Sequence, residues 1–270
     1  MNTLQSKDNP RIRQLAKLSE SPREARKQSL ALLDGVHLLQ ALLESGKHPL
    51  WGVVTASAMQ REEICQALKL SEARGTEWFE IPDNLMLGIA PTEHPSGILA
   101  VWPFVSNHDQ GQNQSMPKDA CVLMLEEIQD PGNLGTLLRS AQAAGIQYVA
   151  LSEGCAEPWA PKVLRAAMGA HFYLSLLEKS NLIKLAQFRQ PTYAACSEAH
   201  LSAWEGPLSE ARGIVIGNEG SGISPALREA CYATIAIPMA TGCESLNAAI
   251  AGSLLMFERR RQLARIASQP

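Results

Sequence analysis

The sequence lacks any hydrophobic run long enough for a membrane helix. No stretch reaches the roughly 18 uninterrupted apolar residues that a membrane-spanning helix requires. The first residues are MNTLQSKD, and no apolar signal core follows them. We therefore expect a protein that is neither secreted nor embedded in a membrane.

The cysteines lack the spacing of a metal or disulfide framework. Six cysteines are scattered along the chain, and none belongs to a Cys-x-x-Cys pair. This distribution argues against a zinc ribbon and against a disulfide-rich scaffold. A reducing cytoplasm is the compartment that fits such thiols best.

The chain as a whole also lacks a strong charge of either sign. Its formal net charge is −3, with 46% hydrophobic and 19% charged residues in 270, which is ordinary globular usage and suggests about two domains. Basic residues gather at the ends, however: residues 7–27 hold seven Lys or Arg against three acids (7 − 3 = +4), and 258–265 hold four against one (4 − 1 = +3). These ends are either phosphate-binding surfaces or solvated helix faces, and charge alone favours the second.

A polar segment divides the chain. Residues 106–118 contain no aliphatic side chain except Met116 and end in Pro117-Lys118, a composition typical of linkers. The predicted domains are residues 1–105 and 119–270, both of plausible size.

Both parts read as α/β structure, because apolar runs alternate with segments of helical periodicity. The second part contains continuous apolar runs, which are typical of a parallel sheet covered by helices on both faces. Ligands of such sheets bind beyond the carboxyl ends of the strands. The expected strands are 31–33, 51–54, 78–81, 98–102, 121–125, 148–151, 193–196, 213–216 and 234–237. The expected helices are 9–18, 21–30, 36–44, 62–70, 134–144, 160–169, 181–189, 225–231 and 246–264.

The first of three notable junctions follows the strand at 121–125. In the helix after it, Leu134, Leu137, Leu138 and Ala141 share one face and predict core packing, while Arg139 lies on the opposite side together with Gly135. By itself, this junction is as well explained by a helix cap at Asn133 and a surface cation at Arg139.

The second junction, 213–225, runs from a buried strand into three glycines that surround Glu219. The spacing of Gly217, Gly220 and Gly222 excludes both a Walker A loop and the Gly-x-Gly-x-x-Gly dinucleotide pattern. Glycines expose backbone groups to a bound molecule. A tight turn before a helix capped by Ser224 explains part of the segment, but it does not explain Glu219.

The third junction, 235–251, leads into the long last helix. Ser245 is the predicted N-cap of that helix, and the small residues after it allow close packing. Neither Ser245 nor Cys243 has a nearby histidine or acid that would mark it as a nucleophile.

Taken together, the three junctions resemble the motifs of a known family in their order and spacing, although none is specific by itself. Asn133-x-Gly135-x-x-x-Arg139, then Ile216-Gly217-Asn218-Glu219-Gly220-x-Gly222, then Ile237-Pro238-Met239 with Ser245-Leu246-Asn247, resemble the three motifs of the TrmH/SpoU family of the SPOUT superfamily. Members are RNA ribose 2′-O-methyltransferases that use S-adenosylmethionine. In the first part, residues 33–39 and 93–100 resemble the family's L30e-like substrate-binding domain, with Ser96 where a glutamine is common.

The resemblance implies an α/β fold with a deep trefoil knot in the second domain, and a homodimer in which the last helix and the first motif pack near the partner. It implies an active site whose catalytic residues are Arg139, Asn133, Glu219, Ser245 and Asn247. The cofactor S-adenosylmethionine is expected to contact Gly217, Asn218, Ile237, Met239 and Leu246. The RNA is expected to contact the basic residues Lys7, Arg11, Arg13, Arg23 and Arg26, and no metal is expected.

The chemistry limits what Arg139 can do. A ribose hydroxyl is a poor acid and must lose its proton as the methyl group is transferred. Arginine is permanently protonated, so we expect Arg139 to orient the hydroxyl and stabilise the developing alkoxide rather than to act as the base.

Three alternatives remain open at this stage. The substrate could be transfer RNA, although family members with this N-terminal extension commonly act on large ribosomal RNA. A non-catalytic RNA-binding protein of the same fold is a second reading, against which the intact polar motif residues speak. A nucleotide-dependent oxidoreductase is a third, but the dinucleotide fingerprint is missing.

Overall fold

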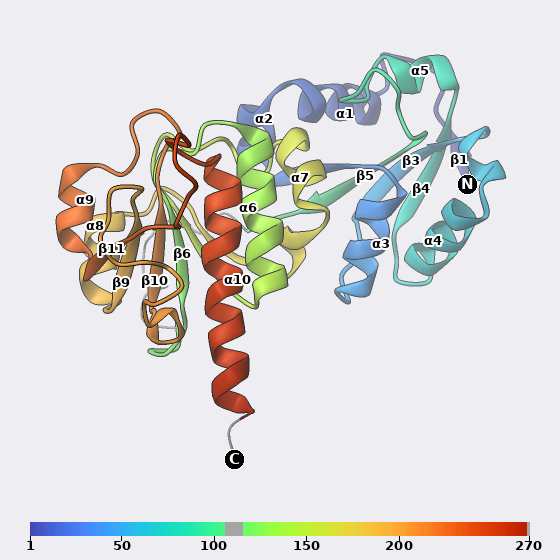
Figure 1. Ribbon diagram of the computed structural model, residues 1–270. Helices are drawn as coiled ribbons and strands as arrows, with labels where there is room; N and C mark the ends of the chain where they lie inside the picture. The colour runs from blue at the N-terminus through green and yellow to red at the C-terminus, as the bar shows by residue number, and fades with distance from the viewer. Residues whose placement is uncertain (106–115, 269–270) are drawn as a thin grey trace. The chain divides into compact units, whose positions relative to one another are not determined.

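The computed structural model describes residues 1–105 and 116–268. Most of the predicted linker, residues 106–115, lies outside the described residues. By their contacts, residues 1–105 and 157–172 form one compact unit, and residues 116–156 and 173–268 form a second. Each unit has its own sheet and is described by itself (Figure 1).

The first unit is built on a five-stranded mixed sheet in the order β1-β4-β3-β5-β2. The central pair β3 and β4 is parallel, whereas β5 runs antiparallel to both of its neighbours. The strands are β1 (Asn2–Thr3), β2 (Leu30–Asp34), β3 (Trp51–Thr55), β4 (Glu77–Ile81) and β5 (Ile98–Pro103).

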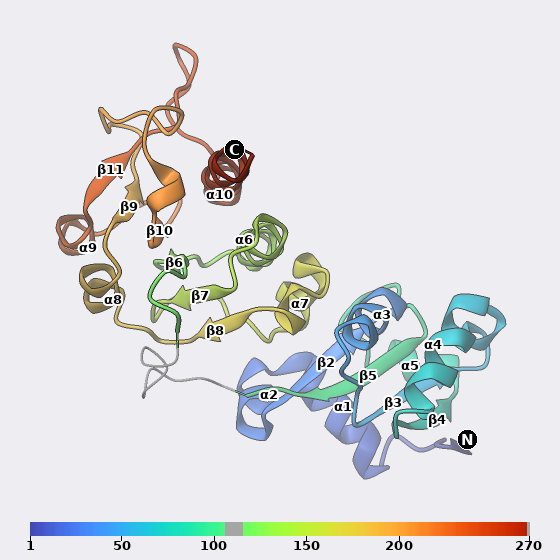
Figure 2. The same ribbon diagram turned by 90° about the horizontal axis from the view of Figure 1, so that it is seen from below.

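Helices cover both faces of this sheet (Figures 1 and 2). On one face, Ile12, Leu15 and Leu18 of the first helix are buried in a core that also contains Leu85 and Met86. Two further helices, α3 and α4, pack against each other on the opposite face. The helices are α1 (Pro10–Glu20), α2 (Pro22–Gln28), α3 (Val36–Glu44), α4 (Glu62–Glu72) and α5 (Asp83–Leu87), with a 3-10 turn η1 (Ala58–Gln60).

Residues 157–172, far along the chain, complete the first unit. Trp159 stacks on Phe104 with ring centroids 4.3 Å apart, and Phe172 packs edge-on against Trp102 at 5.0 Å. The segment forms α7 (Pro161–Ala167) and η3 (Ala170–Phe172), of which α7 lies against β2. The division expected from the sequence placed this helix in the second domain, because a polar linker cannot reveal a return of the chain through aromatic contacts.

The second unit has a six-stranded sheet in the order β11-β9-β10-β6-β7-β8, and every neighbouring pair in it is parallel. The prediction of a parallel sheet is therefore confirmed. The strands are β6 (Val122–Leu125), β7 (Tyr148–Leu151), β8 (Ser175–Leu177), β9 (Thr192–Ala195), β10 (Gly213–Ile216) and β11 (Ala233–Ile235).

Helices lie on both faces of this sheet as well (Figure 2). On one face α8 and α9 bury Leu185 and Leu227 against the strands, and on the other α6 and α10 run side by side. Gly252 of α10 permits this close packing, because a Cβ there would lie 2.4 Å from Leu137 Cδ2 and 3.2 Å from Ile216 Cγ1. The helices are α6 (Pro131–Ala144), α8 (Leu182–Phe188), α9 (Pro225–Ala230) and α10 (Ala248–Ala267), with a 3-10 turn η4 (Leu208–Glu210).

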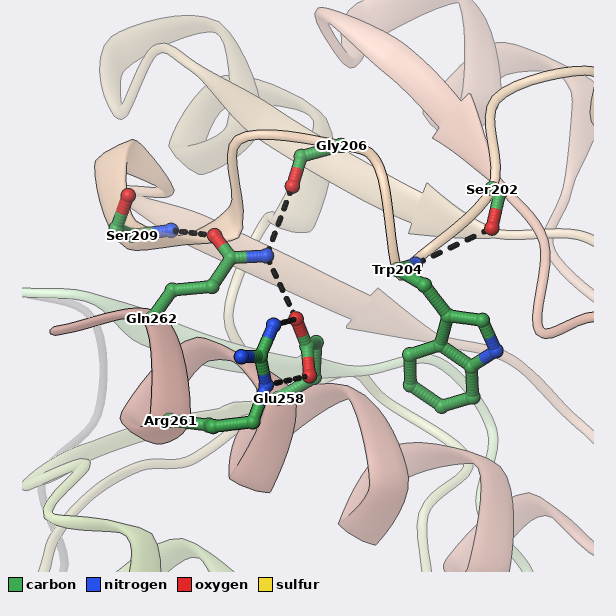
Figure 3. Close-up of polar contacts among 7 residues, drawn as sticks. All are labelled: Ser202, Trp204, Gly206, Ser209, Glu258, Arg261 and Gln262. Atoms are coloured by element: carbon green, nitrogen blue, oxygen red, sulfur yellow. Dashed lines mark hydrogen bonds and ion pairs between the residues drawn. The ribbon is translucent and has the colours of Figure 1, made fainter. Parts of the chain in front are cut away.

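The last helix also holds the connection between β9 and β10 (Figure 3). The side-chain amide of Gln262 donates to the carbonyl of Gly206 and accepts from the backbone N–H of Ser209, both at 2.9 Å. The amide also donates to Glu258, whose two carboxylate oxygens accept from Arg261 at 2.7 Å. The hydrogen bonds from Arg261 lower the pKa of Glu258. This network fixes the segment that leads into β10.

Candidate active site

A pocket of about 490 Å³ lies at the carboxyl ends of three adjacent parallel strands. Ala195 ends β9, Ile216 ends β10 and Ile235 ends β11, and all three line the pocket. Residues of the segment before α10 and of its first turn, including Leu246 and Ala248, form another wall. This is the edge at which parallel α/β sheets bind ligands.

The glycine-rich loop after β10 is a small, closed turn built on Asn218. Asn218 and Gly222 exchange two backbone hydrogen bonds, at 3.1 and 2.9 Å. The side chain of Asn218 accepts from the backbone N–H groups of Gly220 and Ser221 at 2.8 and 3.1 Å, and it donates to the carbonyl of Glu127 at 2.9 Å. Asn218 therefore sets the shape of this wall as well as lining the pocket.

Gly217 is required at the start of the same loop. A Cβ at this position would lie 2.3 Å from the carbonyl oxygen of Gly222 and 2.6 Å from the amide nitrogen of Ile223. Backbone atoms on both sides of the turn cannot move apart without opening it. Gly217 thus serves a close approach of the backbone to itself, and the exposure of backbone groups to a bound molecule stays a prediction.

Sequence reasoning missed Glu126, which anchors the far end of the loop. Its carboxylate accepts from the backbone N–H of Ser224 at 2.7 Å and from the Ser224 hydroxyl at 2.6 Å. Ser224 in turn caps α9, with Pro225 in the first turn, as predicted. Nothing in the local pattern marks Glu126, since its partner is 98 residues away along the chain.

Three polar side chains from the three motifs meet in one hydrogen-bonded row. Asn133 donates through Nδ2 to Glu219 Oε1, and Asn247 donates through Nδ2 to Asn133 Oδ1 at 3.0 Å. Glu219 also lines the pocket. The structure therefore brings together residues from α6, from the loop after β10 and from the start of α10, which the sequence separates by up to 114 positions.

The helix cap expected at Ser245 is wrong, and so is the alternative that explained Asn133 as a helix cap. The N-cap of α10 is Asn247, not Ser245: its Oδ1 accepts from the backbone N–H groups of Ala249 and Ile250. The N-cap of α6 is Asp130, so Asn133 lies inside the first turn with its side chain free to reach Glu219. Ser245 instead lines the pocket. Several capping residue types stand close together here, and only tertiary contacts choose among them.

All five residues expected to contact the cofactor line the same pocket: Gly217, Asn218, Ile237, Met239 and Leu246. The end of β9 adds Cys196, Ser197 and Glu198, which no motif had indicated. Their position after a strand of the same parallel sheet was the available signal.

Arg139 does not line this pocket. It lies on α6 six positions after Asn133, and its side chain is exposed. Gly135, placed on the same side of the helix by the sequence pattern, is buried. Among the described residues, no hydrogen bond joins Arg139 to the row formed by Asn133, Glu219 and Asn247.

The basic residues expected to bind RNA differ in how exposed their side chains are and in whether those side chains are engaged in contacts within the protein. Arg11 pairs with Glu77 at 2.7 Å and covers the rings of Trp51 and Phe79, so it serves the packing of the first unit. Arg26 is half-buried and bound to Glu157, with contacts as short as 2.7 Å.

The remaining basic residues are more exposed to solvent. Arg13 is exposed and pairs with the exposed Asp8, and Lys7, Lys17 and Arg23 are exposed as well. Arg13 and Lys17 of α1 line a shallow hollow of about 370 Å³. Lys27 is exposed too, so the available positive charge of this segment is on Lys7, Arg13, Lys17, Arg23 and Lys27.

Among the described residues, no group of three or more His, Cys, Asp or Glu side chains could hold a metal ion. Within the same residues, no helix is long and apolar enough to cross a membrane.

The fold and the site define a class of protein, an α/β protein with a ligand pocket at the carboxyl edge of a parallel sheet. Residues 120–257 match the family model described as the SpoU rRNA Methylase family, and residues 9–100 match the MRM3-like substrate binding domain. The chain belongs to the SpoU rRNA methylase family, as the resemblance of its motifs indicated.

Relatives match over almost the whole chain. An uncharacterized tRNA/rRNA methyltransferase of Synechocystis is 31% identical, with 96% of this chain and 94% of the relative covered. The 23S rRNA (guanosine(2553)-2′-O)-methyltransferase RlmP of Bacillus subtilis is 28% identical, with 96% and 100% covered. An AdoMet-bound rRNA methyltransferase from Sinorhizobium meliloti shares the fold, with a TM-score of 0.82 at 21% identity over 97% of this chain and 98% of the other.

Proposed function

We propose that this protein transfers a methyl group from S-adenosylmethionine to a ribose 2′-hydroxyl of ribosomal RNA. One observation carries the proposal: Asn133 of the first motif is hydrogen-bonded to Glu219 of the second and to Asn247 of the third, and Glu219 lines the pocket. The RNA 2′-O-methylation named for the Bacillus relative supports the same reaction.

The pocket fits the cofactor. Aliphatic walls from Ile216, Ile235 and Ile237 suit an adenine ring, and the closed glycine turn offers backbone groups to its edge. The close backbone approach at Gly217 leaves no room there for a side chain. When bound, S-adenosylmethionine supplies the electrophilic methyl group.

The protein's own residues have to place and activate the hydroxyl. The row of Asn133, Glu219 and Asn247 holds its side chains in a fixed orientation, so donors and acceptors are set before the ribose arrives. Ser245 adds a hydroxyl to the pocket wall. Arg139 orients the ribose hydroxyl and stabilises negative charge that develops on its oxygen.

A homodimer completes this arrangement. Arg139 is exposed and does not line the pocket of its own chain, so its guanidinium is available to the site of a second copy. Beside α6, the helix α10 exposes Ile250, Leu254 and Phe257, which lie on one helical stripe at i, i+4 and i+7. This apolar stripe is the proposed contact surface with the second copy.

Ribosomal RNA is proposed rather than transfer RNA, with the first unit as its binding domain. The match of residues 9–100 to a substrate binding domain supports this role, as does the ribosomal substrate named for the Bacillus relative. A transfer RNA substrate is the alternative, favoured by the joint tRNA/rRNA name of the Synechocystis relative. The proposed location is the cytoplasm, which agrees with six free thiols.

Titration calorimetry with S-adenosylmethionine, followed by transfer of its labelled methyl group to RNA, tests the proposal. The RNA is isolated from a strain that lacks the gene, and the modified positions are mapped by comparison with the parent strain. Ribose methylation of ribosomal RNA is the expected result. Cofactor binding without transfer to any RNA would indicate the non-catalytic reading instead.

The same assay tests the expected independence from metal. Methyl transfer needs no Lewis acid, so activity is expected to persist in chelator as long as the RNA stays folded. Activity that returns only on addition of Mg²⁺, with an RNA whose fold is unchanged, would contradict this expectation.

A further inference from the structure

The first unit contains a further pocket, lined in part by the stretch 93–100 and tied through Asp34 to the stretch 33–39. The resemblance singled out both stretches, and the proposed reaction uses neither. The pocket has a volume of about 450 Å³, within the range of small-ligand sites. It is lined by Ser57, Arg61, Asp83, Met86, Leu87 and His94, together with neighbouring residues of the loop 93–97. The loop comes from the second stretch, and the residue that holds it comes from the first.

Asp34, in the first stretch, holds the loop in place. Its carboxylate accepts hydrogen bonds from the hydroxyls of Thr92 and Ser96, both at 3.2 Å. The backbone N–H of Gly35 donates to the carbonyl of Ile98 at 3.2 Å. Both ends of the loop are thus tied to the end of β2.

The other side of the loop is tied to the end of β3. The backbone N–H of Thr55 donates to the carbonyl of Gly97 at 2.9 Å. Gly97 has a φ of +83°, and a Cβ there would lie 2.6 Å from the Cβ of Ala58. Arg61 adds a hydrogen bond to the carbonyl of Ser96. The pocket is therefore formed in advance of any ligand.

The side chains that face the pocket combine flat or apolar surface with a hydrogen-bonding edge. Leu87 is 60% exposed and His94 is also exposed, so both can contact a planar ring. The guanidinium of Arg61 has further N–H donors beyond the one bound to Ser96. Asp83 uses one oxygen to accept from Ser57 at 2.5 Å and keeps the other as an acceptor.

The charges around the pocket argue against a phosphate as the occupant. Arg61 and His94 stand beside two carboxylates, Asp83 and Glu93. The positive charge that could meet phosphates lies instead on α1, which packs on the same face of the sheet as α5 (Figure 1). A nucleobase is bound by stacking and by donors and acceptors that face its edge, whereas the phosphates of the RNA backbone are bound by cations. The pocket therefore suits a base, and the basic surface of α1 suits the phosphates.

We propose that this pocket binds an unpaired nucleobase of the RNA substrate, stacked against His94 and Leu87 with its edge facing Arg61 and Asp83. A base inside a duplex cannot enter such a hollow, so the pocket selects RNA with a single-stranded loop or bulge near the methylated ribose. The proposal rests on the proposed function, since it names how the same enzyme recognises its RNA.

The test compares the double variant Leu87→Ala/His94→Ala with the matched double variant Leu70→Ala/His37→Ala. Leu70 and His37 are exposed on α4 and α3, on the other face of the same sheet. Methyl transfer to ribosomal RNA from the gene-deleted strain is measured against RNA concentration. Loss of one base stack is expected to raise KM for RNA about tenfold in the pocket variant, with kcat and the Kd for S-adenosylmethionine unchanged. The matched variant is expected to behave as the wild type.

A second measurement addresses the unpaired base directly. An unstructured RNA oligonucleotide is expected to compete with ribosomal RNA for the wild type and to compete at least several-fold less well for the pocket variant, whereas a fully paired hairpin does not distinguish them. Equal KM values for the pocket variant and the wild type, or an equal rise in the matched variant, overturn the proposal. If the wild type transfers no methyl group, the proposed function fails, and filter binding of the same RNA by the two double variants still decides on the pocket.

Discussion

At the scale of single residues, burial changes the chemistry of His171 in the first unit. The side chain is 2% exposed, and its Nε2 lies 2.7 Å from the carbonyl of Pro158, which can only accept a hydrogen bond. The proton of the neutral ring therefore belongs on Nε2. Burial lowers the pKa of His171 from 6.5 to about 4.

This shift predicts a loss of stability on mild acidification. As pH falls from 6.5 towards 4, the unfolded chain binds a proton that the folded chain does not, so the free energy of unfolding decreases. The contribution of His171 is about 3 kcal/mol across this window. Urea unfolding of the wild type and of His171→Phe at several pH values measures it. The variant is expected to have the flatter pH dependence, and parallel curves would contradict the assignment.

Arg139 carries the second prediction at this scale. Arg139→Ala is expected to abolish methyl transfer, because the variant lacks the guanidinium that stabilises the developing charge. The unfolding midpoint and the Kd for S-adenosylmethionine are expected to stay as in the wild type, because Arg139 is exposed and does not line the pocket. Arg139→Lys keeps the charge but not the planar donor set, and most of the activity is expected to be lost. Near-normal turnover by the alanine variant would refute the role.

At the scale of elements, the basic N-terminal segment packs the first unit, and its proposed contact with RNA is a second role that the sequence could not separate from packing. The helix α1 buries Ile12, Leu15 and Leu18 in the core of the first unit. Deletion of residues 1–28 would therefore unfold that unit rather than report on RNA binding. The exposed positive charges of the same segment have to be tested with the chain intact.

Charge reversal is the suitable test. Lys17→Glu/Arg23→Glu is expected to weaken RNA binding and to reduce the slope of log affinity against log salt by about 1.5, because two phosphate contacts are lost. Lys69→Glu/Lys184→Glu makes the same change in net charge at exposed sites elsewhere and is the control. Filter binding at several salt concentrations measures both. An unchanged slope in the first variant would remove this segment from the RNA site.

The packing of α10 on α6 yields a further prediction. Helix propensity by itself would favour Gly252→Ala by up to about 1 kcal/mol. The added Cβ would lie 2.4 Å from Leu137, which is fully buried and has little room to move. The overpacking is expected to dominate and to lower the free energy of unfolding by about 1–2 kcal/mol. Denaturant unfolding gives the sign, and a stabilised variant would show that α10 can shift freely.

At the scale of the whole molecule, the proposed dimer makes the active site a shared structure. Leu254→Asp/Phe257→Asp places two charges on the exposed stripe of α10 and is expected to give monomers without methyl transfer activity. Phe188→Asp, at a site on α8 that is 65% exposed, is the control and is expected to leave the assembly intact. Sedimentation equilibrium measures the mass of each variant.

Mixing two inactive variants tests whether Arg139 serves the other copy. In a mixed dimer of Arg139→Ala and Glu219→Ala, one of the two sites would combine an intact arginine with an intact glutamate. About a quarter of the wild-type activity is then expected after the subunits exchange. No recovery from a mixture that demonstrably exchanges subunits would place Arg139 with its own chain.

Much of this protein could be determined from its sequence alone. The strand at 148–151 and the helix at 36–44 begin and end where predicted, because hydrophobic periodicity and the glycines that flank the helix are local signals. The second and third motifs likewise indicated residues that line the pocket, since each follows a strand of one parallel sheet, whereas Asn133 and Arg139 of the first motif and Asn247 of the third do not line it.

The tertiary structure decided what depends on partners distant in the sequence. The two-residue strand β1 exists only because it pairs with β4, and residues 157–172 join the first unit through aromatic contacts, the packing of α7 on β2 and the ion pair of Glu157 with Arg26. Glu126 and Asn247 acquired their roles in the same way, from loops far along the chain. Local patterns reflect the preferences of neighbouring residues, whereas strand order, helix caps and the row of Asn133, Glu219 and Asn247 follow from packing that only the folded chain brings about.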